Sequence, residues 1–267
     1  MNNIHLEEYV LTRNGCVLHY WLTGLKNRPL MIMTHGASIN HLEFEPQLAD
    51  FAKQYRLLLW DVRGHGLSRP ADPHFSVKEA VQDLITLLDS QKVDTAILLG
   101  HSMGGNLIQE IAFYHPERVK ALVCVDCTCN TLKLNPLETL RVKMARPILE
   151  LYPSNIFRRQ SANISSEQPA IRQKLYEMLS GSKVDYINVM VELTECLHYE
   201  PQYQIKNPLL IIVGDKDKTG NIRKVAPIWA ERDKGSKLVI IPNAGHMVNM
   251  DKPELFNQHV LNFLKEN

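Results

Sequence analysis

The sequence lacks any long apolar run. None approaches the roughly 18 residues that would span a bilayer. The first ten residues, MNNIHLEEYV, are polar and acidic where a secretory signal requires a basic start and an apolar centre. We therefore expect a cytoplasmic protein without a membrane partner.

An excess of charge of one sign is also missing. The 267 residues carry a formal net charge of +1, which gives no electrostatic reason to expect nucleic acid as a partner. Hydrophobic residues make up 45% and charged residues 22%, the composition of a globular protein. This length suits one α/β domain with an insertion. We expect a small-molecule substrate, and the sequence carries no signal for the oligomeric state.

Paired cysteines are absent as well. Five cysteines form an odd set, which does not indicate a disulfide framework. Three of them, Cys124, Cys127 and Cys129, are clustered, but no second cysteine or histidine pair follows at zinc spacing. We therefore expect reduced thiols at the end of a buried strand and no metal ion.

Short apolar runs are what the sequence does contain. Two of them, EYVLT and CVLHYWLTG, are joined by the turn signal RNG and predict a β-hairpin. The later runs are nearly continuous, as in strands buried on both faces of a parallel sheet. They are LMIMTHG, RLLLWDV, TAILLGHS, ALVCVDC, LLIIVGD and KLVIIPN.

Amphipathic stretches alternate with these runs. In SVKEAVQDLITLLDSQ, apolar residues recur at helical spacing, Ser76 is an N-cap candidate and Glu79 is the matching capping-box acid. The alternation predicts an α/β fold with a mostly parallel twisted sheet and helices on both faces.

One region breaks the alternation. Residues 131–204 contain helical patterns and no buried-strand run, where a short connection would suffice. We interpret this region as a helical cap, or lid, over the strand ends. Residues 1–130 and 205–267 are then the core domain.

Polar residues follow the predicted parallel strands at their carboxyl ends, where open α/β sheets bind ligands. The residues in these places are His35, Gly36, Ala37, Asp61, Ser102, Asp126, Asp215, Asp217 and His246.

The stretch GHSMGG places Ser102 between Gly100 and Gly104. A nucleophile lifted above a strand end needs small residues two positions before and two after it. The backbone N–H groups of Met103 and Ala37 are then candidate oxyanion donors. By itself, the motif equally fits a polar residue in a glycine-rich turn.

The order of the polar residues favours the nucleophile. A serine hydroxyl needs a base, and the base needs an acid that fixes its tautomer. An acid and then a histidine follow Ser102 at later strand ends, which selects His246 as the base. Asp217, Asp126 and Asp215 remain candidates for the acid.

The motifs MTHG, DVRGHGLS, GHSMGG, GDKDKT and AGHMVNMDKPE together resemble the α/β-hydrolase superfamily, in the branch with a helical cap. Nearly the whole chain shares this resemblance, although the cap matches only in position and helicity. The resemblance implies that the triad acid is Asp217, after Gly214, and that the base is His246, after Gly245. It also implies oxyanion donors at Met103 and Ala37.

His35 and Gly36 belong to the same loop as Ala37 and are expected to shape the oxyanion site. His101 adjoins Ser102 and is expected to shape the site as well.

Two departures narrow the chemistry. Related dehalogenases and epoxide hydrolases carry Asp where this chain has Ser102, and the loop HGAS lacks the GGG run of hydrolases for tertiary alcohol esters. We expect a carboxylesterase-like serine hydrolase for a small to medium apolar ester, without a cofactor. The alternatives are a carbon–carbon bond hydrolase, a thioesterase, a lactonase, a perhydrolase, or a ligand-binding module without turnover.

Overall fold

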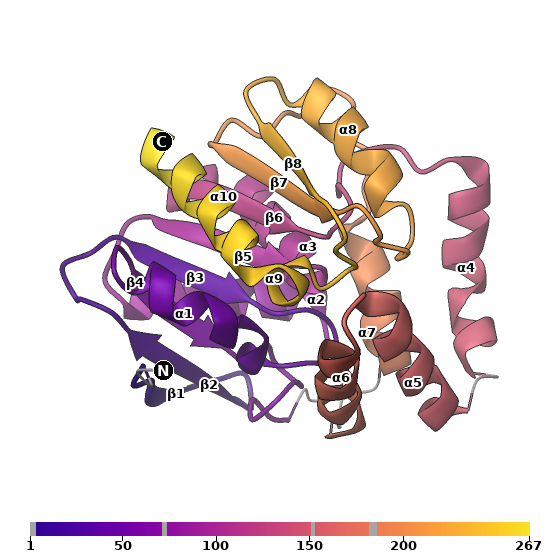
Figure 1. Ribbon diagram of the computed structural model, residues 1–267, viewed down its shortest axis with the longest axis horizontal. Coiled ribbons are helices and arrows are strands. Elements are labelled where there is room, and N and C mark those ends of the chain that lie inside the picture. The colour runs from indigo at the N-terminus through magenta and orange to yellow at the C-terminus, as the bar shows by residue number, and fades with distance from the viewer. Residues whose placement is uncertain (1–3, 71–73, 151–152, 182–185) are drawn as a thin grey trace.

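One mixed sheet forms the centre of the protein (Figure 1). The computed structural model describes residues 4–70, 74–150, 153–181 and 186–267. In this part of the chain, eight strands are ordered β1-β2-β4-β3-β5-β6-β7-β8. Their bounds are β1 Glu7–Arg13, β2 Cys16–Thr23, β3 Leu30–Thr34, β4 Arg56–Trp60, β5 Ala96–His101, β6 Val119–Val125, β7 Leu209–Gly214 and β8 Lys237–Ile241.

The first two strands form the predicted hairpin. They pair antiparallel up to Arg13 opposite Cys16, and the turn residues Asn14 and Gly15 have positive φ angles of 43° and 73°. β2 also pairs antiparallel with β4, and all the later pairings are parallel. The fold class predicted from the sequence is therefore confirmed.

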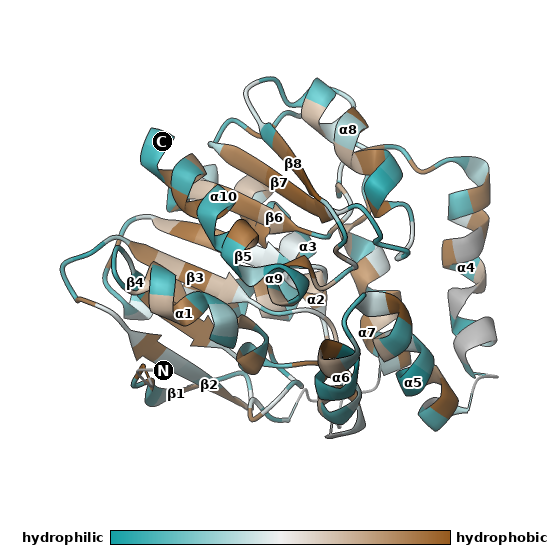
Figure 2. Cartoon of the chain, viewed as in Figure 1, coloured by the Kyte–Doolittle hydropathy of each residue, from teal (hydrophilic) through white to brown (hydrophobic). Residues whose placement is uncertain are grey.

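Helices cover both faces of the sheet, which explains the continuous apolar runs. Successive strand residues point to opposite faces. Leu98 belongs to the core under α2 (Val77–Ser90), α3 (Met103–Tyr114) and α8 (Ile222–Arg232). Its neighbour Leu99 belongs to the core under α1 (Glu45–Phe51), α9 (Val248–Asp251) and α10 (Pro253–Glu266). Figure 1 shows α1, α9 and α10 in front of the sheet, and Figure 2 shows the apolar character of the strands between the layers.

At the start of α2, the structure contains one of the two hydrogen bonds of the predicted capping box. The Glu79 N–H donates to Ser76 Oγ (3.4 Å), as expected for the N-cap. The Glu79 carboxylate was expected to bond back to Ser76, and this was wrong. It accepts from Arg13 Nη1 (2.8 Å) and Asn14 Nδ2 (2.9 Å), which joins the hairpin to α2.

The helical insertion, residues 131–204, lies between β6 and β7. It contains α4 (Pro136–Glu150), α5 (Ser154–Ser165), α6 (Pro169–Gly181), α7 (Tyr186–Glu192) and the 3-10 helix η3 (Leu193–Cys196). α5 packs against α6, and α4 packs against α7. Figure 1 shows these helices together at one side of the sheet, with α4 farthest out.

Within the described ranges, no helix combines the length and apolar character needed to cross a membrane. All five cysteines are unpaired and buried, as expected.

His65 is a fully buried histidine on the loop after β4. Its ring lies between those of His35 and Phe75, at centroid distances of 5.2 Å and 5.7 Å. Its Nδ1–H donates to the Arg63 carbonyl oxygen (3.1 Å). Burial lowers the pKa of His65 from 6.5 to about 3, so the folded protein keeps this ring neutral.

This buried ring predicts a loss of stability in acid. Below pH 6.5 the unfolded chain binds a proton at His65, whereas the folded chain does not until about pH 3, so the free energy of unfolding falls as the pH falls. Between pH 6.5 and pH 5 the loss is about 2 kcal/mol, at about 1.4 kcal/mol per unit. Urea unfolding at pH 7 and pH 5 measures the free energy of unfolding at each pH. Between these pH values, the decrease should be smaller in His65→Gln than in wild type by this amount.

The free energy of unfolding of the variant is compared with that of wild type at each pH, because other buried histidines also make stability depend on pH. Burial lowers the pKa of His35, whereas the pKa of His101 is raised by Glu43 against the effect of burial. His115→Gln, at a half-exposed position, controls for the removal of a histidine. An equal loss of stability in wild type and His65→Gln would contradict the prediction.

Candidate active site

Ser102 lies in a tight turn between β5 and α3. Its backbone has φ 50° and ψ −114°, a sparsely populated conformation for a residue with a side chain. A Cβ at Gly100 would lie 2.3 Å from the Gly104 oxygen, and a Cβ at Gly104 would lie 2.0 Å from the Thr34 oxygen. Glycine is therefore required on both sides of the serine, which is the physical basis of the GHSMGG pattern.

The structure brings three predicted side chains together. Ser102 Oγ lies 3.0 Å from His246 Nε2, and His246 Nδ1 lies 3.0 Å from Asp217 Oδ2. They come from the turn after β5, the loop after β8 and the loop after β7. A hydroxyl, an imidazole and a carboxylate in this sequence of contacts can pass a proton from the serine to the histidine.

Asp217 is held as a carboxylate. It is only 3% exposed, and the Thr219 N–H donates to its Oδ1 (2.7 Å). Burial by itself would raise the pKa of Asp217, but the His246 ring and the Thr219 hydrogen bonds outweigh burial and hold the pKa below its ordinary value. The negative charge can therefore stabilise a protonated His246.

The two rival acids have other contacts. Asp126 is buried, and its oxygens accept from the N–H groups of Gly214 (2.9 Å) and Val248 (3.2 Å). Burial and the nearby Asp217 raise the pKa of Asp126 well above its ordinary value. Asp215 is more exposed and lies 3.3 Å from Lys216 Nζ. Neither of these carboxyl groups has a hydrogen bond to the His246 ring comparable to that of Asp217.

A metal would have one candidate position in the described part of the chain. Asp126, Asp217 and His246 offer ligand atoms within 4.8 Å of one another. Both Asp126 oxygens already accept backbone hydrogen bonds, and Asp217 and His246 are bonded to each other. This donor set fits a hydrogen-bonded triad better than a coordination shell.

The loop after β3 supplies the expected neighbours of Ser102. Gly36 and Ala37 line the same cavity as Met103 and Ser102. The Gly36 N–H donates to Glu43 Oε2 (3.0 Å). The N–H groups of Ala37 and Met103 thus remain the candidates to face a substrate oxygen.

His35 lies behind this loop rather than in the cavity. It is fully buried, its Nδ1–H donates to the Gly36 carbonyl oxygen (2.7 Å), and its Nε2 accepts from the Val62 N–H (3.0 Å). Its ring therefore supports the loop and does not reach a ligand directly.

Glu43 is a buried acid that the sequence did not indicate. Its Oε1 lies 2.8 Å from His101 Nδ1, and the opposite nitrogen of His101 donates to the His246 carbonyl oxygen (2.9 Å). Burial would lower the pKa of His101, but Glu43 outweighs burial and raises it. Both ring nitrogens of His101 thus lie close to polar partners, and its role in shaping the site stays a prediction.

A cavity of about 500 Å³ opens in front of Ser102 and His246. Both the core and the helical insertion contribute to its wall. Among the described residues that line it, none is Asp, Glu, Lys or Arg. The wall is mostly apolar and includes Ile39, Met103, Leu175, Leu179, Met190, Leu193 and Met247.

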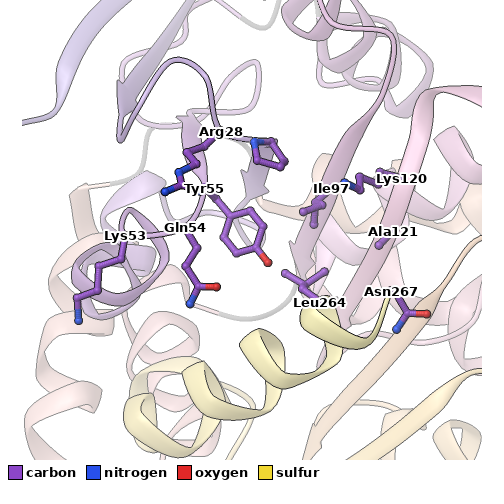
Figure 3. A pocket seen from close by; sticks show the side chains of 10 residues that line it. Arg28, Lys53, Gln54, Tyr55, Ile97, Lys120, Ala121, Leu264 and Asn267 are labelled. Atoms are coloured by element: carbon purple, nitrogen blue, oxygen red, sulfur yellow. The ribbon is translucent and has the colours of Figure 1, made fainter.

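A second hollow of about 280 Å³ lies at the opposite ends of the strands (Figure 3). Ile97 and Ala121 line it near the beginnings of β5 and β6, whereas Ser102 follows the end of β5. Figure 3 shows the Tyr55 ring pointing into it. This hollow contains none of the predicted site residues, so the first cavity is the candidate active site.

Comparisons with known proteins identify a family and relatives of this chain. The sequence model of a family described as "Serine aminopeptidase, S33" matches residues 26–253. 3-Oxoadipate enol-lactonase 2 of Acinetobacter baylyi is 26% identical over 257 residues, which cover 94% of this chain and 94% of the relative. The 2-(acetamidomethylene)succinate hydrolase of Mesorhizobium japonicum is 26% identical, with 88% of each chain covered.

Solved structures show the same fold. A hydrolase from Pseudomonas aeruginosa PA01 superposes with a TM-score of 0.81 at 24% sequence identity, covering 98% of this chain and 99% of the other.

Proposed function

The chain belongs to the serine aminopeptidase S33 family of α/β hydrolases, and on this premise we propose that it cleaves a small to medium apolar carboxylic ester through an acyl-enzyme. One observation carries the proposal. Two contacts of 3.0 Å connect Ser102 to His246 and His246 to Asp217, at the mouth of an apolar cavity.

In the proposed reaction, Ser102 Oγ attacks the ester carbonyl carbon while His246 Nε2 takes the hydroxyl proton. Asp217 stabilises the imidazolium, and the N–H groups of Met103 and Ala37 hold the oxyanion. Each such donor typically contributes about 3 kcal/mol. The intermediate collapses, and His246 returns the proton to the departing alcohol. Water then attacks the acyl-enzyme by the same route and releases the acid.

The substrate class follows from the cavity wall. We propose that the helical insertion is the cap of the active site, because Leu175, Leu179 and Met190 reach the cavity from α6 and α7. An apolar wall stabilises an acyl or alcohol chain by removing it from water. Among its described residues it offers no Lys or Arg to a carboxylate substrate.

A lactone is the second candidate substrate. A lactone is a cyclic ester, and the similarity to 3-oxoadipate enol-lactonase 2 favours this reading. 3-Oxoadipate is a dicarboxylate, so its enol-lactone keeps one carboxylate, whereas the described cavity wall here contains no Lys or Arg. We therefore expect neutral lactones to be cleaved in preference to carboxylate-bearing ones.

A substrate panel tests the proposal. The panel contains p-nitrophenyl esters of increasing acyl length, a thioester, a ketone with a scissile carbon–carbon bond, a peracid assay, and neutral and carboxylate-bearing lactones. We expect the highest kcat/KM for a neutral short or medium ester, together with labelling of Ser102 by a fluorophosphonate. Labelling without turnover of any panel member would instead indicate a binding module.

We further propose that the protein works in the cytoplasm. Its five unpaired, buried cysteines fit a reducing compartment.

A further inference from the structure

One corner of the helical insertion lies directly against the loop that carries His246. This corner is the turn of residues 165–168, between α5 and α6. The Met247 N–H donates to the Ser165 carbonyl oxygen (2.8 Å). On the other side of the histidine, a Cβ at Gly245 would lie 2.8 Å from the same oxygen. Both chain neighbours of His246 therefore touch the turn.

Asp251 joins the turn to the loop from a buried position at the end of α9. It is 1% exposed, and its Oδ2 accepts from the N–H groups of Gly245 (2.7 Å) and Glu167 (3.1 Å). Its Oδ1 accepts from the Ser166 hydroxyl. A single carboxylate is thus bonded both to the residue before His246 and to two residues of the turn.

The N–H groups of Gly245 and Glu167 can only donate, and the Ser166 hydroxyl, which can also accept, donates to Asp251 here. A carboxylate can accept every one of the three hydrogen bonds, and buried donors left without an acceptor are costly. An asparagine at this position carries no charge, so its oxygen would accept the two N–H bonds more weakly, and its NH₂ group would require the Ser166 hydroxyl to turn and accept.

The turn itself is fixed by further bonds. The Gln168 N–H donates to Ser166 Oγ (3.0 Å), and Arg172 Nε donates to the Ser166 carbonyl oxygen (2.7 Å). The Gln168 side-chain amide donates to the backbone oxygen of Asp251. The turn can therefore serve as a firm support for the loop.

The His246 ring has little freedom in the triad, because it must reach Ser102 and Asp217 at 3.0 Å on opposite sides. A displacement of about 1 Å at such a contact can lower a rate by about 10²-fold. The His246 carbonyl is also held by a hydrogen bond from His101 (2.9 Å).

We infer that Asp251 and the 165–168 turn position the His246 imidazole, so that this corner of the helical insertion is a fixed part of the catalytic framework and not a lid that swings open. The inference rests on the proposed function. Asp251 does not touch the reacting atoms and is a positioning residue.

The test is Asp251→Asn, which keeps the size of the side chain and removes the charge that strengthens the three bonds. We expect kcat for p-nitrophenyl butyrate to fall on the order of 10²-fold, with KM close to that of wild type. The rate of fluorophosphonate labelling at Ser102 should fall in parallel. Glu254→Gln is the matched control, because Glu254 is an exposed acid three residues further along, and it should retain the wild-type kcat.

A milder variant keeps the test decisive if Asp251→Asn does not fold. Ser166→Ala removes one donor to the carboxylate, and we expect kcat about 10-fold lower at unchanged KM. Ser180→Ala, at an exposed position on α6, is its control.

Three results would overturn the inference. A folded Asp251→Asn variant with wild-type kcat would refute it. If Asp251→Asn does not fold, a Ser166→Ala variant with wild-type kcat would refute it instead. A raised KM at unchanged kcat would show that the turn is only a wall of the binding cavity. In all three cases an active wild-type enzyme leaves the proposed function standing. A wild-type protein that neither hydrolyses esters nor is labelled at Ser102 would refute both.

Discussion

Ser102→Ala should lower kcat for p-nitrophenyl butyrate by at least about 10⁴-fold and should leave the protein folded. Alanine removes only the Oγ atom, which lies 3.0 Å from His246 Nε2 and is the atom we propose to form the acyl bond. The turn geometry depends on Gly100 and Gly104, which the variant keeps. Steady-state kinetics and circular dichroism measure the two effects separately.

Ser90→Ala is the control for this variant. Ser90 lies at the end of α2, and its hydroxyl donates to the Leu87 carbonyl oxygen (2.6 Å), away from the cavity. It should keep the wild-type kcat and the full labelling by a fluorophosphonate. Turnover by Ser102→Ala at more than a small fraction of the wild-type rate would mean that another group, or water, attacks the ester.

Asp217→Asn should lower kcat by about 10⁴-fold. The wild-type carboxylate accepts the proton on His246 Nδ1 at 3.0 Å, which leaves Nε2 free to act as a base toward Ser102. An asparagine can instead turn its NH₂ group toward the ring, and this stabilises the wrong tautomer. The amide also carries no charge to stabilise the imidazolium.

The two neighbouring acids provide a sharp comparison. Asp215→Asn changes a more exposed carboxylate only two residues away, and it should stay within a few-fold of the wild-type kcat. Asp126→Asn removes an acceptor of the Gly214 and Val248 N–H groups, so its expected effect is mainly on stability, at about 1–3 kcal/mol. A larger loss of kcat in either variant than in Asp217→Asn would transfer the role of triad acid to that residue.

Local chemistry explains why the fold could be predicted. A strand buried on both faces has to be apolar at nearly every position, so the run LLIIVG is visible as β7 without any partner strand. A helix start is also local, which is why the Ser76 cap was found. The Glu79 carboxylate was assigned wrongly because its partners, Arg13 and Asn14, belong to a distant hairpin.

The sequence alone also indicated where Ser102 lies, because the crowding at Gly100 is imposed by Gly104 in the same turn. The crowding at Gly104 instead comes from Thr34 on the neighbouring strand β3. The motif resemblance favoured Asp217 over Asp215 and Asp126, and only the tertiary structure shows the contact of Asp217 with the His246 ring. It likewise turned His35 inward, placed Glu43 beside His101, and joined Ser166 to Asp251 across 85 positions of the chain. Hydrogen bonds between such distant residues depend on the direction of each loop in space, and a direction in space leaves no periodic pattern in the sequence.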